Sequence, residues 1–184
     1  MIEVTPLAMP EVKFLTFRRH ADARGHFVET YAAQAFAAAG LPTLWVQDNE
    51  AFSAAAGTVR GLHFQTPPHG QAKLVRVVSG RILDVVVDVR RGSPTFGQHT
   101  AVALSADRSE ALFIPEGFAH GYCTLSLETM VQYKVSRPYA PAAERTVLWC
   151  DPALGIAWPV GPEQAIVSAR DAAAAPFAAL DGGA

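Results

Sequence analysis

Short segments of alternating apolar and polar residues make up much of this chain, and turn residues separate them. Five segments are rich in Val, Ile, Leu, Thr and aromatic residues: Lys73–Val78, Ile82–Val89, His99–Leu104, Ala111–Ile114 and Thr129–Ser136. Short strands separated by Pro and Gly predict an all-β fold, a small antiparallel β-barrel or jelly roll. Helix is expected only over Ala32–Ala39, which Gly40 would end, and in the Ala-rich stretch from about 165 to 175.

Period-two alternation places several ionisable side chains on strand faces that they share with apolar ones. The expected groupings are Lys73 with Val75 and Val77, Tyr133 with Val131 and Val135, and Asp84 and Asp88 with Val86. Small barrels hold ligand pockets in their interior. A Lys or Tyr that projects into such a pocket therefore indicates a functional site.

Length and composition fit one globular domain spanning residues 1–184. Half of the residues are apolar and 17% are charged, which excludes a disordered or fibrous chain. A formal charge of -2 gives no broad basic surface for nucleic acid. Twelve of the fifteen basic residues are arginine, which suits bidentate recognition of phosphate.

The chain carries no sequence signal for a membrane or for secretion. Its apolar runs stop short of the ~18 residues that a bilayer-spanning helix needs. The N-terminal segment contains Glu3 and no basic stretch before an apolar run, so it does not resemble a signal peptide. Cys123 and Cys150 are expected to be free thiols in a reducing compartment, and we expect a cytoplasmic protein.

The stretch Gly57–Gln65 and the following Gln71–Val77 hold the most informative polar residues. Two strands joined by a Pro-Pro loop could bring Arg60, His63 and Lys73 into one pocket. Strict alternation would place Arg60 and His63 on opposite faces, but a β-bulge at Gly61 would remove that difficulty. The alternative is that His63 is structural, as lone histidines often are.

A metal site is not predicted. Barrel metalloenzymes use two histidines with one residue between them, whereas this chain has His63-Phe64-Gln65 at that spacing. The other histidines show no ligand-like pairing; they are His20, His26, His69, His99 and His120.

Three further polar stretches have two readings each. Arg24, in a charged stretch near the N-terminus, could recognise an anionic ligand while Glu29 accepts hydrogen bonds from it, or the stretch could lie on a solvated face. Gln47-Asp48-Asn49 could bind a nucleobase edge or a ribose, or could form a turn. His120 follows a strand and a Pro-Glu-Gly turn, and it could meet a phosphate or a polar neighbour such as Asp84.

Taken together, these motifs resemble those of dTDP-4-dehydrorhamnose 3,5-epimerases. The resemblance runs from about Phe17 to Asp171, with His20 in place of the first Phe of a Phe-x-Asp-x-Arg-Gly motif. The matching stretches are 20–25, 46–49, 57–65, 71–77, 114–121, Tyr133-Lys134 and Trp149-x-Asp151-Pro152.

The resemblance implies a fold and a reaction. The fold is a cupin-like jelly-roll β-barrel with a few short peripheral helices, and the protein is a homodimer that needs no metal or organic cofactor. The substrate is dTDP-4-dehydro-6-deoxy-D-glucose, which is inverted at C3 and C5. His63 is the implied base, Asp171 orients it, Tyr133 returns a proton and Lys73 polarises the ketone.

The resemblance also implies the residues that bind the nucleotide sugar. Arg60 and His120 match positions that bind phosphate, and Tyr139 matches the aromatic residue that stacks on thymine. The remaining implied contacts are Arg24, Glu29, Gln47, Asp48, Asn49, Lys73, Glu144 and Arg170.

Two departures from the family pattern concern the binding residues. Glu50-Ala51 stands where His or Ser is common, and Arg170 stands where Lys is common beside the terminal Asp. Two alternatives remain at this stage: an epimerase that inverts only one carbon, and a barrel that binds a nucleotide sugar without catalysis.

Overall fold

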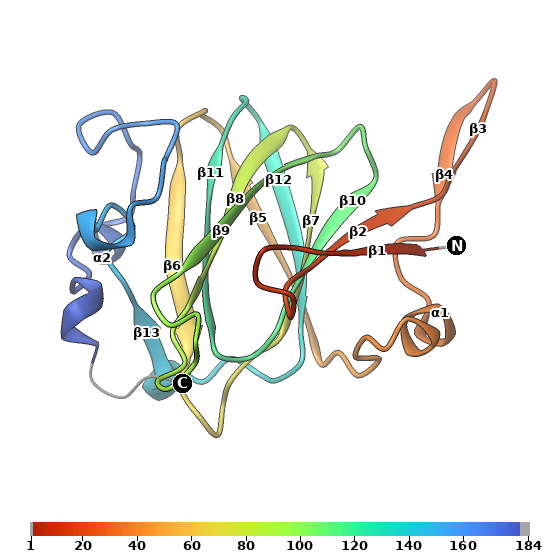
Figure 1. Ribbon diagram of the computed structural model, residues 1–184. Coiled ribbons are helices and arrows are strands. Elements are labelled where there is room, and N and C mark those ends of the chain that lie inside the picture. The colour runs from red at the N-terminus through yellow and green to blue at the C-terminus, as the bar shows by residue number, and fades with distance from the viewer. Residues whose placement is uncertain (1, 181–184) are drawn as a thin grey trace.

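Two antiparallel β-sheets face each other and form a jelly-roll β-barrel (Figure 1). The computed structural model describes residues 2–180. The larger sheet has the order β1 (Ile2–Pro6), β2 (Lys13–Phe17), β10 (Glu110–Ile114), β7 (Lys73–Ser79), β12 (Thr129–Val135) and β5 (Gln47–Ser53). The smaller has the order β13 (Glu144–Thr146), β6 (Val59–Gln65), β11 (Phe118–Thr124), β8 (Arg81–Asp88) and β9 (His99–Ser105).

All five predicted strands are confirmed, and each of their ends lies within one residue of the expected position. The predicted alternation is confirmed as well. Val75, Val77, Val86 and Val131 are buried in the core between the sheets, and Tyr133 packs against that core. The inward face of each strand therefore supplies the apolar side chains that pack between the two sheets. The few polar side chains on that same face point into the barrel interior.

Helices are few and short. The predicted helix near residue 35 is confirmed as α1 (Ala33–Ala38), whose Phe36 is buried. The Ala-rich tail forms only α2 (Ala169–Ala172), which Ser168 caps by accepting a hydrogen bond from the Asp171 amide at 3.1 Å. Three turns of 3-10 helix are η1 (Pro141–Ala143), η2 (Pro152–Leu154) and η3 (Phe177–Ala179). Among the described helices, none has the length and apolar character that a membrane crossing requires.

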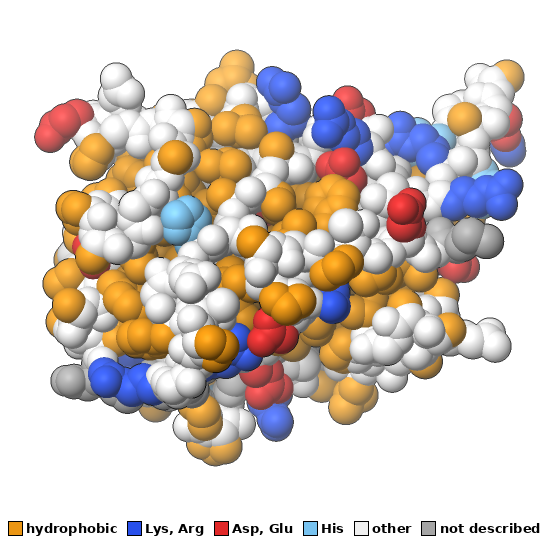
Figure 2. Space-filling view, viewed as in Figure 1, with side chains coloured by type: hydrophobic (Ala, Val, Ile, Leu, Met, Phe, Trp, Pro, Cys, Tyr) orange, Lys and Arg blue, Asp and Glu red, His pale blue; other side chains and the backbone are white. Residues whose placement is uncertain are grey.

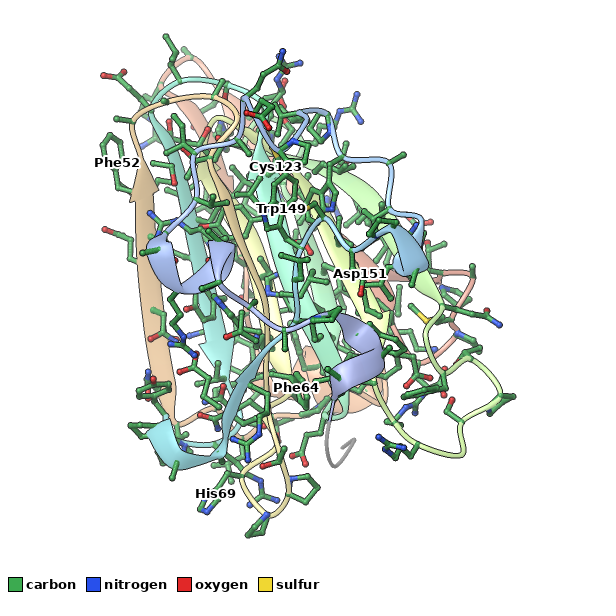
Figure 3. All side chains as sticks on the ribbon, turned by 90° about the vertical axis from the view of Figure 1, so that its left-hand side faces the viewer. Phe52, Phe64, His69, Cys123, Trp149 and Asp151 are labelled. Carbon is green, nitrogen blue, oxygen red and sulfur yellow. The ribbon has the colours of Figure 1, made fainter. Side chains whose placement is uncertain are left out.

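The C-terminal segment covers the outer face of the smaller sheet. Leu62 and Phe64 of β6 lie against Val147 and Leu154 in one buried cluster. Val59, Cys123 and Trp149 form a second, which Figure 3 shows beneath the C-terminal loops. This cover holds α2 beside β6. Cys123 and Cys150 are free thiols, as the sequence predicts.

A hairpin of β3 (Arg19–Asp22) and β4 (Gly25–Val28) projects away from both sheets (Figure 1). Its residues are exposed except for Val28, which is half-buried. In Figure 2, Lys and Arg side chains gather along the upper right of the molecule, over this hairpin and the strands beside it.

The expected bulge lies at Gly61. In the register of β6 against β11, His63 pairs with His120 and Arg60 pairs with Tyr122, so Gly61 and Leu62 together oppose Gly121. Gly61 has φ +119°, and a Cβ there would lie 2.6 Å from the Cα of Gly121. The bulge gives Arg60 and His63 access to one cavity, as predicted.

We expect Gly61→Ala to lower the free energy of unfolding by about 3 kcal/mol, because it adds a backbone clash to an unfavourable φ. Gly92→Ala is the matched control, since Gly92 has φ +85° and no atom near its added Cβ. The control should lose only about 1–2 kcal/mol. Urea unfolding of both variants measures the difference, and equal losses would contradict a tight contact at Gly61.

Candidate active site

A cavity of about 460 Å³ opens between the two sheets. His63 and Arg60 enter it from β6, His120 from β11, Lys73 from β7 and Tyr133 from β12. The first three belong to the smaller sheet and the last two to the larger one. Potential bases and acids therefore face one another across the barrel interior.

His63 forms a dyad with Asp171. Its Nε2 lies 2.7 Å from Asp171 Oδ1, and Asp171 Oδ2 accepts a hydrogen bond from the Gly61 amide at 3.2 Å. Burial favours the neutral acid, but these hydrogen bonds and the attraction to His63 outweigh it and hold the pKa of Asp171 below its usual range. Asp171 thus stays ionised and holds the Nε2 proton of His63, which leaves Nδ1 free to act as the base.

Lys73 places a buried ammonium group beside this dyad. Its Nζ donates a hydrogen bond to the His63 carbonyl at 3.1 Å. Burial lowers the pKa of Lys73 to about 8, against the opposing attraction of Asp84 and Glu144. The group is therefore still mostly charged at neutral pH, where it can stabilise a developing negative charge.

Tyr133 lies on the sheet that faces His63. Burial raises the pKa of its phenol, so the hydroxyl keeps its proton throughout the physiological range. A protonated phenol opposite a histidine base is suited to donate a proton.

His120 contacts Asp84, the polar neighbour that was one of its two predicted partners. Its Nε2 lies 2.9 Å from Oδ1 of the fully buried Asp84, and its ring also lines the cavity beside Arg60. Burial lowers the pKa of His120, and attraction to Asp84 opposes this shift. The Arg60 guanidinium donates to the Phe52 carbonyl at 2.9 Å and to Ser53 Oγ at 3.3 Å.

An adjoining cavity of about 250 Å³ shares His63, Lys73 and Tyr133 with the first. Gln47, Asn49, Tyr139 and Glu144 line its other walls. The Tyr139 hydroxyl donates to Glu144, and Arg170 forms an ion pair with the same carboxylate at 2.8 Å. Burial opposes ionisation of Glu144, but these two partners keep its pKa below the usual range.

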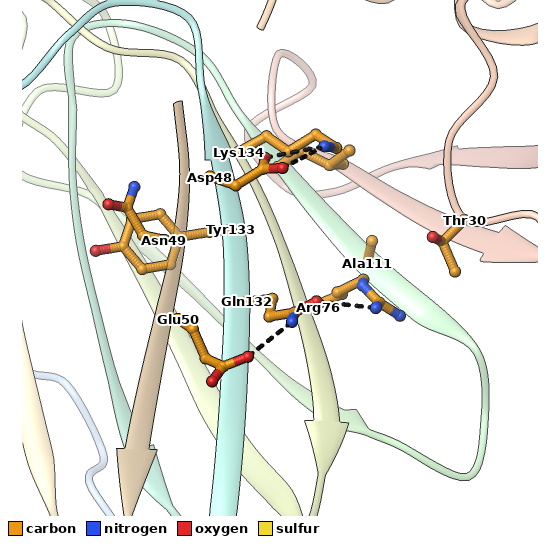
Figure 4. Close-up of a pocket in the computed structure, with 10 residues that line it drawn as sticks. Thr30, Asp48, Asn49, Glu50, Arg76, Ala111, Gln132, Tyr133 and Lys134 are labelled. Atoms are coloured by element: carbon orange, nitrogen blue, oxygen red, sulfur yellow. Dashed lines mark hydrogen bonds and ion pairs between the residues drawn. The ribbon is translucent and has the colours of Figure 1, made fainter. Parts of the chain in front are cut away.

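Asp48 does not lie in either of these two cavities with its neighbours Gln47 and Asn49. Residues 47–53 form strand β5 rather than the alternative turn, so Asp48 and Glu50 point to the outer face of the sheet. There Asp48 pairs with Lys134 at 2.9 Å and Glu50 accepts from Gln132 at 2.8 Å (Figure 4). Of the departure at Glu50-Ala51, only Ala51 lines the cavity that holds His63, and the second departure, Arg170, lines the same cavity.

Arg24 and Glu29 also lie outside these cavities in this chain. Arg24 sits at the turn of the projecting hairpin and pairs with Asp22 at 2.5 Å. Glu29 lies near Phe17 and Phe36, at the base of the hairpin. Neither residue contacts His63 or Lys73.

Tyr122 and the loop from Ile166 to Ser168 also line the cavity, although they were not among the predicted site residues. Alternation from His120 would have placed Tyr122 on the same face of its strand. No comparable pattern exists for the loop, because its position depends on the packing of the C-terminal segment. Among residues 2–180, no three His, Cys, Asp or Glu side chains lie close enough together to hold a metal ion.

Comparison with known proteins identifies the family of this chain. A sequence model of the family described as dTDP-4-dehydrorhamnose 3,5-epimerase matches residues 6–179. The chain belongs to this epimerase family. A relative from Salmonella typhimurium, named dTDP-4-dehydrorhamnose 3,5-epimerase, is 45% identical over 177 residues, which cover 95% of this chain and 94% of the relative.

Two solved structures of similar proteins carry sugar nucleotides. One is a dTDP-6-deoxy-D-glucose-3,5-epimerase from Legionella pneumophila in complex with dTDP-4-keto-L-rhamnose, with a TM-score of 0.93, 38% identity, and coverage of 98% of this chain and 95% of that chain. The other is ChmJ, a 3'-monoepimerase from Streptomyces bikiniensis in complex with dTDP-quinovose. Its TM-score is 0.88 at 38% identity, and the match covers 94% of this chain and 87% of that chain.

The buried charge of Lys73 predicts an unusual pH dependence of stability. Its pKa lies below the ordinary value of 10.5, so the unfolded chain binds the extra proton, and the free energy of unfolding rises with pH between about 8 and 10.5. Relative to Lys73→Met, the natural chain should therefore gain about 2 kcal/mol between pH 7.5 and 9.5. Urea unfolding at several pH values tests this expectation.

Gln132→Met is the matched control, because Gln132 lies on the outer face of the same sheet, where it is bonded to Glu50, and carries no group that titrates. The difference in free energy of unfolding between this variant and the natural chain should stay constant over the same pH range. A flat difference for Lys73→Met as well would contradict a buried ammonium at that position.

Proposed function

We propose that this protein inverts C3 and C5 of dTDP-4-dehydro-6-deoxy-D-glucose to give dTDP-4-dehydro-L-rhamnose. The observation that carries this proposal is the placement of His63 and Tyr133 on facing sheets, with the Lys73 ammonium in the same cavity. An inversion at carbon needs a base on one face and an acid on the other, and this arrangement supplies both.

The inversion at each carbon, C3 or C5, begins with loss of the proton from that carbon, which lies next to the 4-keto group. Nδ1 of His63 takes this proton, and the C–H electron pair moves into the enolate. Asp171 stabilises the resulting imidazolium, to which it is bonded at 2.7 Å. The Lys73 ammonium stabilises the negative oxygen of the enolate.

The second half of each inversion returns a proton from the opposite side. The Tyr133 hydroxyl donates it to the enolate carbon. The phenolate then regains a proton from solvent, and the His63 imidazolium releases to solvent the proton it took. Only protons move in these steps, so no redox cofactor takes part.

The two adjoining cavities would hold different parts of the substrate, in which the diphosphate links the sugar to the nucleoside. Arg60 and His120 are suited to the diphosphate, since an arginine and a histidine can both donate to phosphate oxygens. Gln47, Asn49, Tyr139, Glu144 and Arg170 would contact the nucleoside end, with the half-exposed Tyr139 ring available to stack on thymine.

We also propose a homodimer in which the β3–β4 hairpin of one subunit completes the site of the other. Arg24 and Glu29 lie away from the cavities of their own chain, and Phe27 of the same hairpin is 69% exposed. A projecting hairpin with an exposed aromatic residue and exposed charged groups is suited to reach a second subunit. Unpaired thiols at Cys123 and Cys150 support a cytoplasmic location.

Incubation with the 4-keto sugar nucleotide in deuterated water tests the reaction. Deuterium at both C3 and C5 is expected, measured by NMR spectroscopy. His63→Ala should slow exchange at both carbons by at least about 100-fold, because it removes the base. Tyr133→Phe should leave proton removal possible but block inversion, because the acid is lost.

The matched controls are His99→Ala on the far strand β9 and Tyr31→Phe, whose hydroxyl bonds only to the Thr43 carbonyl among the described residues. Both variants should exchange deuterium into C3 and C5 of the substrate at the rate of the natural chain. Deuterium at only one carbon would identify a monofunctional epimerase, and none at either carbon would reject the catalytic proposal.

Mixed dimers test the shared site. Arg24→Ala and His63→Ala chains should each be nearly inactive alone. If the hairpin acts in the partner's site, each mixed dimer contains one intact site, and random mixing restores roughly a quarter of the natural kcat/KM. If Arg24 acts within its own chain, every site of a mixed dimer is defective and mixing restores nothing.

A further inference from the structure

Asp84 lies behind the wall of the main cavity and takes no part in the steps above. It sits on β8, is fully buried, and holds His120 through the 2.9 Å contact of its Oδ1. Its Oδ2 has no hydrogen-bond partner among the described residues. A buried carboxylate with a free oxygen is costly unless nearby positive charge offsets it. This cost suggests that Asp84 has a role in the site.

The groups that face His120 set its charge. They are Asp84 on β8, Lys73 on β7, and His63 and Arg60 on β6, with Tyr122 on its own strand β11. Burial and the charges of Lys73 and His63 disfavour the imidazolium, whereas Asp84 favours it, and the net result is a lowered pKa for His120. His120 is therefore neutral at pH 7 when the cavity holds no anion.

The contact with Asp84 also decides which nitrogen carries the proton. A carboxylate can only accept hydrogen bonds, so Nε2 of His120 is the protonated nitrogen. Nδ1 then bears a lone pair, and no described protein group bonds to it. Such a nitrogen cannot donate to a phosphate oxygen until the ring gains a second proton.

We propose that Asp84 is a positioning residue that fixes the Nε2–H tautomer of His120, so that binding of a nucleoside diphosphate beside Arg60 is coupled to protonation of Nδ1. The second proton comes from solvent, and the bound diphosphate and Asp84 together stabilise the imidazolium. This inference rests on the proposed function only in taking the ligand to be a nucleoside diphosphate.

The coupling has a measurable consequence for affinity. Because the complex holds one proton more than the free protein, the Kd for dTDP should rise as pH increases above the pKa of His120. The protonation of His120 should make this Kd increase by up to about tenfold for each pH unit. The ammonium of Lys73 contributes little at pH 7, because it is already mostly protonated there.

Calorimetric titration of the whole protein with dTDP at pH 7, in two buffers of different ionisation enthalpy, measures the proton uptake. His120→Gln should take up about one proton fewer than the natural chain, because its side chain can keep the bond to Asp84 but cannot titrate. Asp84→Asn should also reduce the uptake and weaken dTDP binding. His99→Gln is the matched control and should behave like the natural chain.

NMR of protein labelled with ¹⁵N-histidine reads the tautomer directly, with the His120 signals identified by their loss in His120→Gln. The neutral Nε2–H form is expected without ligand and the doubly protonated form with dTDP. An Nδ1–H form without ligand, or equal proton uptake by the natural chain and His120→Gln, would overturn the proposal. Deuterium exchange by the natural chain in the same preparations tells this failure apart from failure of the proposed epimerase activity.

Discussion

The tight contact between Gly61 of β6 and Gly121 of β11 is the constraint on which the site depends. It allows two residues of β6 to oppose one residue of β11, and the sheet continues on both sides of the irregularity. Without the extra residue, alternation would place Arg60 and His63 on opposite faces of the strand. The Gly61 amide also binds Asp171, so the same irregularity helps to hold the carboxylate that orients His63.

The site concentrates buried charge in a barrel whose core is otherwise apolar. Lys73, Asp84, His120 and Asp171 are each at most 8% exposed. Burial lowers the pKa of both Lys73 and His120, whereas attraction to Asp84 favours their charged forms. Such groups lower stability individually, and the structure tolerates them because each has a partner of opposite charge or a hydrogen bond. The same low-polarity surroundings would strengthen the proposed effect of Lys73 on an enolate.

Much of this arrangement could be predicted from sequence because the strands are amphipathic. Alternation correctly placed Lys73 with the buried Val75 and Val77, and Tyr133 with the buried Val131 and Val135. Alternation would also have placed Asp48 on the outer face of the sheet if residues 47–49 had been interpreted as a strand. They were instead assigned together to one binding site. The position of Asp171 could not be found in this way, since it depends on the C-terminal segment crossing the outside of β6. Likewise, the direction of the β3–β4 hairpin is set by a turn of the chain, not by a periodic pattern.

The division of the site between two sheets explains why a barrel suits an inversion. Strands of one sheet present side chains from one side only, so a base and an acid on the same sheet would approach a carbon from similar directions. Here His63 comes from the smaller sheet and Tyr133 from the larger, while Lys73 reaches across to the His63 backbone. A substrate held between them has its two faces exposed to different walls. The stereochemical outcome then depends on the separation of two rigid sheets, which their shared apolar core fixes.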